Sequence, residues 1–158
     1  MKIDYLSNNR EFALLLAELC AAEWQHLYAG WNREVALGEL QSQNANGTIP
    51  LCLVAMEQGE LLGTVSIIYD DLPGYEHFNP WVASLFVLQR HRGKKIGSRL
   101  VRAAERLLIK NRVAEAYLFT ESAGAFFEKL GWQVMEQAKA NGYPVFILQK
   151  HFSEAGSP

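Results

Sequence analysis

Apolar residues have the pattern of a strand in some segments of the chain and the spacing of a helix in others, and these patterns predict the order of strands and helices. Residues 81–88 are a nearly continuous apolar run rich in strand-forming residues, which is typical of a buried strand. A basic segment with two glycines, residues 92–97, comes next. The helix that follows is predicted to open near Ser98, a favoured N-cap residue. Its apolar stripe has the spacing of one helical face and consists of Leu100, Val101, Ala104, Leu107 and Leu108.

The remaining pattern predicts a chain of short strands with helices near the start, the middle and the end. The expected strands are residues 2–6, 50–57, 61–69, 114–120, 133–137 and 143–149. The expected helices run from 10 to about 30 and from 32 to about 43, and a last helix follows the strand that ends at 120 and runs to about 130. The turn dipeptide Asn141-Gly142 closes a hairpin between the last two strands. A polar loop, residues 70–80, leads directly into the strand at 81.

The composition fits one domain with a real core. The chain has 158 residues, of which 49% are hydrophobic and 20% charged, and its net charge is -2. No apolar run approaches the length of a membrane span, and the N-terminal residues lack a signal peptide's apolar region, so we expect a cytoplasmic protein without a membrane partner. Cys20 and Cys52 fit no metal-ligand spacing and are interpreted as buried thiols. The charge balance argues against nucleic acid as a partner.

The basic segment has a physical use as an anion site. Six Lys and Arg side chains fall within the thirteen residues 90–102 of a chain whose net charge is negative. The first N–H groups of a helix have no internal partner, and the helix dipole adds positive charge there. Glycines let the backbone approach a ligand closely. The segment therefore predicts a phosphate cradle, with a solvated basic turn as the alternative.

Two blocks of the sequence resemble the GCN5-related N-acetyltransferase (GNAT) superfamily. Residues 92–97, RGKKIG, resemble its acetyl-CoA loop, whose signature is Arg or Gln, two residues, Gly, one residue, then Gly or Ala. Lys95 stands where the first signature glycine is expected. Residues 117–132, YLFTESAGAFFEKLGW, resemble the family's strand, Asn and helix with an aromatic pair before Glu-Lys-Leu-Gly-Phe. Thr120 takes the place of the Asn, and Phe127 takes a place where many members carry Tyr.

The resemblance implies a fold and a co-substrate. The fold is α/β, a mixed, largely antiparallel sheet with flanking helices, in a single domain over residues 1–150 followed by a polar tail, 151–158. The co-substrate is acetyl-CoA, with no metal. In the family the central strand splays from the next one, and pantetheine pairs with its exposed backbone. The cofactor-binding residues carried over are Leu85, Phe86, Val87, Arg92, Gly93, Lys94, Lys95, Ile96, Gly97, Ser98, Thr120, Phe126 and Phe127.

The resemblance also implies each group's role. Backbone groups of Leu85 and Val87 would pair with pantetheine, and amides from Arg92 or Gly93 to Ser98 would hold the pyrophosphate. Thr120 could hydrogen-bond the cofactor as the Asn does. Phe126 and Phe127 would pack beside the thioester end.

The implied reaction is direct attack of a primary amine on the acetyl thioester in a ternary complex. The Val87 amide is the expected oxyanion donor. Since Phe127 has no hydroxyl, the acid is open between a water molecule and one of four tyrosines, Tyr69, Tyr75, Tyr117 or Tyr143. The strand's only polar side chain, Ser84, is a further catalytic candidate, and the candidate bases in the preceding loop are Asp70, Asp71, Glu76 and His77.

The acceptor is left open by the sequence. It could be a small amine, an amino acid, a drug-like amine or a protein N-terminus, and residues 23–31, which include Glu23, Trp24, His26, Tyr28 and Trp31, could line its pocket or merely pack. A non-catalytic acyl-CoA-binding module of the same fold is the alternative function. A nucleotide-binding protein is disfavoured because neither GxxxxGK[ST] nor GxGxxG occurs. Homodimers are common in the family.

Overall fold

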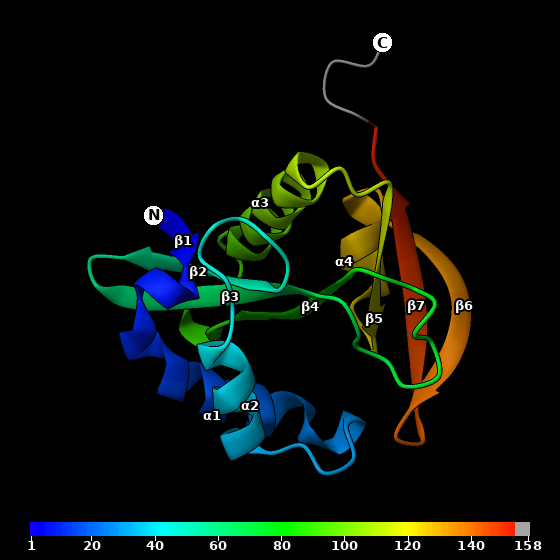
Figure 1. The fold of residues 1–158 in the computed structure, drawn as a ribbon, viewed down its shortest axis with the longest axis horizontal. Helices are drawn as coiled ribbons and strands as arrows, with labels where there is room; N and C mark the ends of the chain where they lie inside the picture. Colours follow the sequence, from blue (N-terminus) through cyan, green and yellow to red (C-terminus); the bar gives the residue numbers. More distant parts are fainter. Residues whose placement is uncertain (154–158) are drawn as a thin grey trace.

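A seven-stranded sheet with helices on both faces forms the frame of the protein (Figure 1). This arrangement is seen in a computed structural model that describes residues 1–153. The strands lie in the order β1-β2-β3-β4-β5-β7-β6, and every neighbouring pair is antiparallel except β4 and β5. The strands are β1 (Lys2–Tyr5), β2 (Leu51–Glu57), β3 (Glu60–Ile68), β4 (Trp81–Val87), β5 (Glu115–Thr120), β6 (Gln133–Ala140) and β7 (Tyr143–His151). The α-helices are α1 (Ala13–Trp24), α2 (Arg33–Gln41), α3 (Ile96–Lys110) and α4 (Gly124–Lys129).

The apolar residues of the central strands explain why helices cover both faces of the sheet. Successive side chains of a strand point to opposite faces, so a strand that is apolar throughout must be covered on both. In β2, Leu51 and Leu53 join the core cluster that contains Leu100 of α3. Cys52 and Val54 join the cluster that contains Leu16 of α1. Figure 1 shows α1 on one side of the sheet and α3 on the other. The predicted fold class is confirmed.

The element boundaries differ from the predicted ones mainly in two helices and in β6, which ends at Ala140 rather than at Gln137. The first α-helix begins at Ala13 rather than Arg10 and ends at Trp24, and a short 3₁₀ segment flanks it at each end (10–12 and 25–27). The prediction that Ser98 caps the third helix is wrong, because α3 already begins at Ile96. Strand β7 includes His151, and residues 154–158 of the predicted tail lie outside the described residues.

The central strands are joined irregularly, and this irregularity opens the sheet. Ser84 has a φ of 54°, and the β3–β4 register shifts opposite it, as in a β-bulge. On the other side, β4 and β5 share a single register pair, Trp81 with Tyr117. The two strands diverge beyond that pair, as Figure 1 shows. The strand predicted as buried over 81–88 is therefore buried at residues 81–83 and at Leu88, but only half-buried at 84–87.

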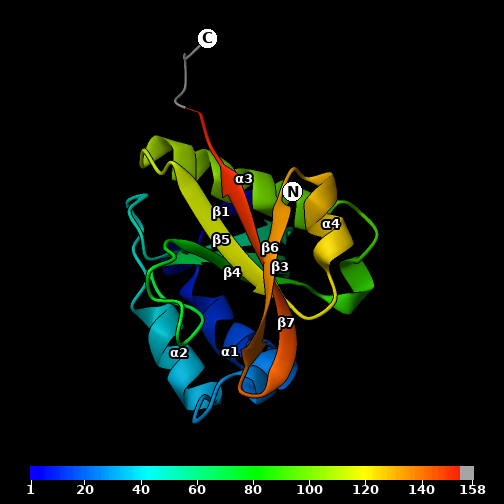
Figure 2. The same cartoon turned by 90° about the vertical axis from the view of Figure 1, so that its right-hand side faces the viewer.

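The second half of the sheet wraps away from the first. Strand β7 pairs with β5 along six residues, from Glu115 opposite His151 to Thr120 opposite Phe146. Figure 2 shows β5, β7 and β6 crossing in front of the other strands. Both cysteines are buried as expected, and burial raises the pKa of the Cys20 thiol to about 12. Within residues 1–153, no helix combines the length and apolar content that a membrane span requires.

Gly63 of β3 is predicted to tolerate no side chain. A Cβ atom there would lie 2.7 Å from the Phe86 carbonyl oxygen and 3.1 Å from Leu100 Cδ1. We expect Gly63→Ala to lower the free energy of unfolding by about 1–3 kcal/mol, because strand and helix must move apart. The matched control is Gly38→Ala in α2, where a Cβ meets nothing within 4 Å and should add up to ~1 kcal/mol. Urea unfolding measures both; equal stability of Gly63→Ala and wild type would contradict the packing described.

Candidate active site

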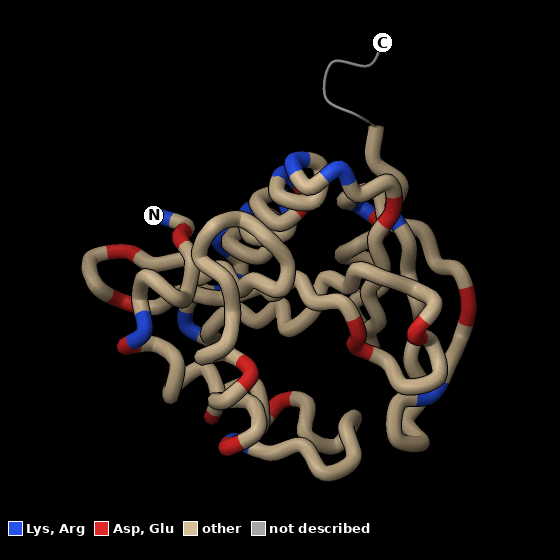
Figure 3. The backbone as a smooth tube through the Cα atoms, in the orientation of Figure 1, with Lys and Arg blue, Asp and Glu red and all other residues tan. Residues whose placement is uncertain are grey.

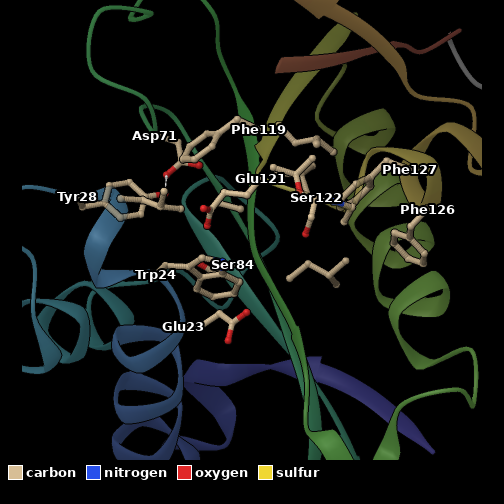
Figure 4. Close-up of a pocket in the computed structure, with 17 residues that line it drawn as sticks. Glu23, Trp24, Tyr28, Asp71, Ser84, Phe119, Glu121, Ser122, Phe126 and Phe127 are labelled. Atoms are coloured by element: carbon tan, nitrogen blue, oxygen red, sulfur yellow. Dashed lines mark hydrogen bonds between the residues drawn. The ribbon is translucent and has the colours of Figure 1, made fainter. Parts of the chain in front are cut away.

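Two cavities meet where β4 leaves β5. One, the basic groove, has a volume of about 560 Å³ and lies between β4 and the start of α3. The other, the acidic cavity, has a volume of about 210 Å³ and lies between the end of α1, β4 and the end of β5 (Figure 4). Five residues line both, so the two spaces are continuous: Glu23, Trp24, Leu85, Ala123 and Phe126. A molecule in the groove can therefore reach one in the cavity.

The backbone of β4 offers hydrogen-bonding groups to the basic groove. The Leu88 N–H donates to the Leu62 carbonyl oxygen of β3 at 3.0 Å. Because successive peptide groups of a strand point to opposite sides, the N–H groups of Val87 and Leu85 point away from β3, into the gap. Arg92 Nε donates to the Val87 carbonyl oxygen at 2.9 Å, which leaves that oxygen a second lone pair. The gap is thus an open strand edge inside a sheet.

The loop before α3 presents free amides at the other end of the groove. Arg99 donates the first bond of the helix, to the Lys95 carbonyl oxygen at 3.1 Å, so the amides of residues 96–98 have no carbonyl of the helix to bond. Lys95 has φ 63° and ψ 17°, the left-handed conformation that glycine adopts most readily. The residue that departs from the family signature therefore keeps the backbone conformation suited to a glycine.

The predicted cofactor residues are divided between the two spaces. Ten of them line the basic groove: Leu85, Phe86, Val87, Arg92, Gly93, Lys95, Ile96, Gly97, Ser98 and Phe126. Thr120 and Phe127 line the acidic cavity instead, and Lys94 lines neither. The Thr120 hydroxyl accepts a hydrogen bond from the Ala123 amide at 3.0 Å, so it stabilises the turn before α4. Phe127 is only 6% exposed and belongs to the main core cluster.

Asp71 is the half-buried carboxylate of the acidic cavity. It comes from the loop between β3 and β4, and Tyr28 Oη donates to its Oδ1 at 2.7 Å, the dashed line in Figure 4. Burial raises the pKa of Asp71 from its ordinary value of 3.8 to about 7; the Tyr28 hydrogen bond opposes this rise, and the charge of Glu39 adds to it. Burial also raises the pKa of Tyr28, which keeps its hydroxyl protonated. Asp71 therefore gains and loses its proton near neutral pH.

Most of the other predicted catalytic candidates line neither the basic groove nor the acidic cavity. Ser84 lines the acidic cavity, but Asp70, Glu76 and His77 are exposed and line neither space. None of the four tyrosines considered as the acid lines the groove or the cavity. Tyr75 and Tyr117 donate instead to glutamates outside the cavity, Glu136 and Glu115. In this conformation none of these tyrosines therefore lines either space, although β5, which carries Tyr117, and the β3–β4 loop, which carries Tyr75, contribute other residues to the cavity lining.

Sequence reasoning missed two contacts of the cavity. The cluster of aromatic residues 24–31 was a signal for Tyr28, but not for its bond to Asp71, 43 positions away. Glu121 carried no signal beyond following the Thr120 position, yet it lines the cavity. Its Oε1 lies 2.8 Å from His26 Nε2. Both contacts join segments far apart in the chain, which no local pattern encodes.

The open strand edge and the two meeting cavities have the layout of a transferase that brings a cofactor and an acceptor together. The sequence profile described as "Acetyltransferase (GNAT) family" matches residues 16–132, and the chain belongs to this family. The predicted resemblance is confirmed, and the family defines the class of protein as an acetyltransferase. Among proteins of curated function, none matches the sequence significantly.

Solved structures share the fold across nearly the whole chain. An aminoglycoside 6'-N-acetyltransferase complexed with coenzyme A is 22% identical, with 96% of this chain and 97% of that chain covered and a TM-score of 0.74. The PaiA N-acetyltransferase from Thermoplasma acidophilum in complex with coenzyme A is 23% identical, with 96% and 100% covered and a TM-score of 0.69. A ribosomal-protein-alanine N-acetyltransferase from Brucella melitensis is 16% identical, with 96% and 100% covered and a TM-score of 0.72. At these identities the likeness shows the fold.

The raised pKa of Asp71 predicts a pH-dependent stability. Between pH 4 and about 7 the folded state keeps a proton on Asp71 that the unfolded state has lost, so the free energy of unfolding falls as pH rises through this range. Asp71→Asn cannot titrate. We therefore expect the variant to gain stability relative to wild type between pH 5 and pH 8, measured by urea unfolding at both values. The same wild-type-to-variant difference at both pH values would contradict the assignment.

Proposed function

We propose that the protein binds acetyl-CoA in the basic groove and transfers its acetyl group to a primary amine in the acidic cavity. One observation carries the proposal: the two spaces, opposite in charge, meet at the open edge of β4. Arg92 and Lys95 line only the groove, Asp71 and Glu121 line only the cavity, and Glu23 lies where the two spaces meet. A polyanionic cofactor and a cationic acceptor would each be attracted to its own side.

The groove can hold the cofactor mainly through backbone groups. Pantetheine would lie along β4 like an added strand and bond the Leu85 and Val87 peptide groups. The pyrophosphate would accept from the amides of residues 96–98, at the positive end of α3. Hydrogen bonds to charged groups contribute roughly 1.5–3 kcal/mol each, so a few amides suffice for useful affinity.

The cavity can supply the proton transfer that the amine needs. The acceptor nitrogen attacks the thioester carbon, the C–N bond forms, and the C–S bond breaks. Asp71, ionised above about pH 7, takes the proton that the amine loses, directly or through one water molecule, and Tyr28 holds the carboxylate in place. The Val87 N–H points into the gap and can donate to the developing oxyanion. A thiol has a reference pKa of about 8.5, so the leaving thiolate can take its proton from water.

The acceptor does not follow from the fold. The names of the structural neighbours include an aminoglycoside enzyme and a ribosomal-protein-alanine enzyme on the same framework. A non-catalytic acyl-CoA-binding module is the second candidate function, favoured by the absence of a hydroxyl at Phe127. A cytoplasmic location and a homodimer, with neither nucleic acid nor membrane as a partner, belong to the proposal as well.

Gly97 provides the test of the groove. A Cβ at Gly97 would lie 3.4 Å from the Phe126 ring, an ordinary contact, so Gly97→Ala should bind acetyl-CoA. Gly97→Glu places a bulky negative charge among the phosphate-binding amides and should abolish binding. At one hundred times Kd, acetyl-CoA adds about 2.7 kcal/mol, a rise in Tm of roughly 5–10 °C. We expect this rise for wild type and Gly97→Ala, but neither for Gly97→Glu nor with ATP in place of acetyl-CoA.

Thiol release separates the enzyme from the binding module. The enzyme releases free CoA from acetyl-CoA only when an acceptor amine is present, whereas the module binds acetyl-CoA without turnover. An unchanged acetyl-CoA affinity in Gly97→Glu would refute the groove assignment, and binding without turnover for any amine would favour the module.

A further inference from the structure

The charges around the acidic cavity define the acceptor more closely, if the proposed acetyl transfer takes place there. We propose that the acceptor carries a second positively charged group, which Glu23 and Glu121 bind at the mouth of the cavity while the primary amine reaches Asp71. The acceptor class would then be a slender diamine or polyamine. A monoamine or an amino acid would lack the second charge or carry the wrong one.

The three carboxylates of the cavity, Asp71, Glu23 and Glu121, lie at two depths. Asp71 is half-buried and bonded to Tyr28, whereas Glu23 and Glu121 are exposed. Glu23 lies near the end of α1, and Glu121 follows the end of β5, so the two come from different walls of the cavity. Figure 4 shows all three among the residues that surround the same space. An acceptor that reaches Asp71 passes between walls that carry the other two.

The negative charge of the cavity is poorly compensated. No Lys or Arg is among the described residues that line it. His26 contacts Glu121, but its Nε2 approaches only Oε1, and in residues 1–153 no protein hydrogen bond engages Oε2. Many of the Lys and Arg residues lie instead along α3 and the loop before it, among the blue segments of Figure 3. A cationic ligand would supply the missing positive charge.

The depths of the carboxylates and the cavity walls favour two separate charges on a narrow chain. Asp71 is half-buried, whereas Glu23 and Glu121 are exposed, so a ligand with a charge at each end can engage both levels. Aromatic rings of Trp24, Tyr28 and Phe119 line the same space and can pack against methylene groups or an ammonium. At about 210 Å³ the cavity is smaller than the roughly 300–1,000 Å³ of pockets for drug-sized ligands. A linear aliphatic chain fits these limits better than a multi-ring amine.

The test compares three acceptors of equal chain length. These are pentylamine, 1,5-diaminopentane and 5-aminopentanoate, which place a methyl, an ammonium or a carboxylate at the far end. The measurement is kcat/KM for thiol release from acetyl-CoA. Because contacts at the rim are solvent-exposed, we expect the diamine to exceed pentylamine by about five- to tenfold, mostly through KM, and the aminopentanoate to be the poorest.

Matched variants test whether Glu23 and Glu121 cause the preference for the diamine. Glu23→Gln and Glu121→Gln should each lower the ratio of kcat/KM for the diamine to kcat/KM for pentylamine, and the double variant should bring that ratio close to one. Glu18→Gln is the control, since Glu18 is an exposed residue of the same helix that contacts Arg33 and lines neither cavity. It should keep the full preference.

The outcomes distinguish a failure of the second-charge proposal from a failure of the proposed acetyl transfer. Equal turnover of pentylamine and the diamine, or variants that lower both acceptors equally, would overturn the second-charge proposal and leave acetyl transfer intact. If acetyl-CoA binds but no amine is acetylated, calorimetric titration of the CoA-saturated protein with 1,5-diaminopentane decides. Binding weakened by the double variant would support the recognition site, and an absence of binding would overturn it. Failure to bind acetyl-CoA at all would instead refute the proposed function.

Discussion

The incomplete pairing of β4 with β5 is the constraint on which the rest of the site depends. A strand in the middle of a sheet normally bonds on both sides, but β4 keeps only one register pair with β5. The peptide groups of Leu85 and Val87 therefore face a gap, and apolar side chains that would otherwise be covered are half exposed. Such an edge is a template for another extended chain. In this protein the gap joins the two faces of the sheet.

The two spaces that meet at the gap differ in charge. On one side, three amides at the start of α3 and the side chains of Arg92 and Lys95 make the groove positive. On the other side, carboxylates make the cavity negative, since the described residues that line it include no Lys or Arg. Burial raises the pKa of Asp71 to about 7, and the charge of Glu39, which does not line the cavity, adds to the rise. The burial of Asp71 thus prepares a group that can accept the proton of an ammonium near neutral pH.

The sequence predicted what local patterns encode. The apolar stripe of α3, the apolar run of β2 and the basic loop with two glycines are set by neighbours in the chain, and they were located correctly. The start of α3 was misplaced because Lys95 adopts a left-handed conformation that its residue type does not favour. The half-burial of β4 and the Tyr28–Asp71 contact depend on how distant segments meet. The resemblance to the family implied the first, and nothing in the sequence indicated the second. The role of each lining residue in binding stays a prediction.

Amide hydrogen exchange, followed by NMR with and without CoA, tests the open strand edge most directly. The Leu88 amide is already bonded to the Leu62 carbonyl oxygen and should exchange at the same rate in both states. The Leu85 and Val87 amides point into the gap, so CoA should slow their exchange severalfold as pantetheine bonds them. If CoA binds and leaves the exchange of both amides unchanged, the cofactor does not lie along β4 and the central claim is contradicted.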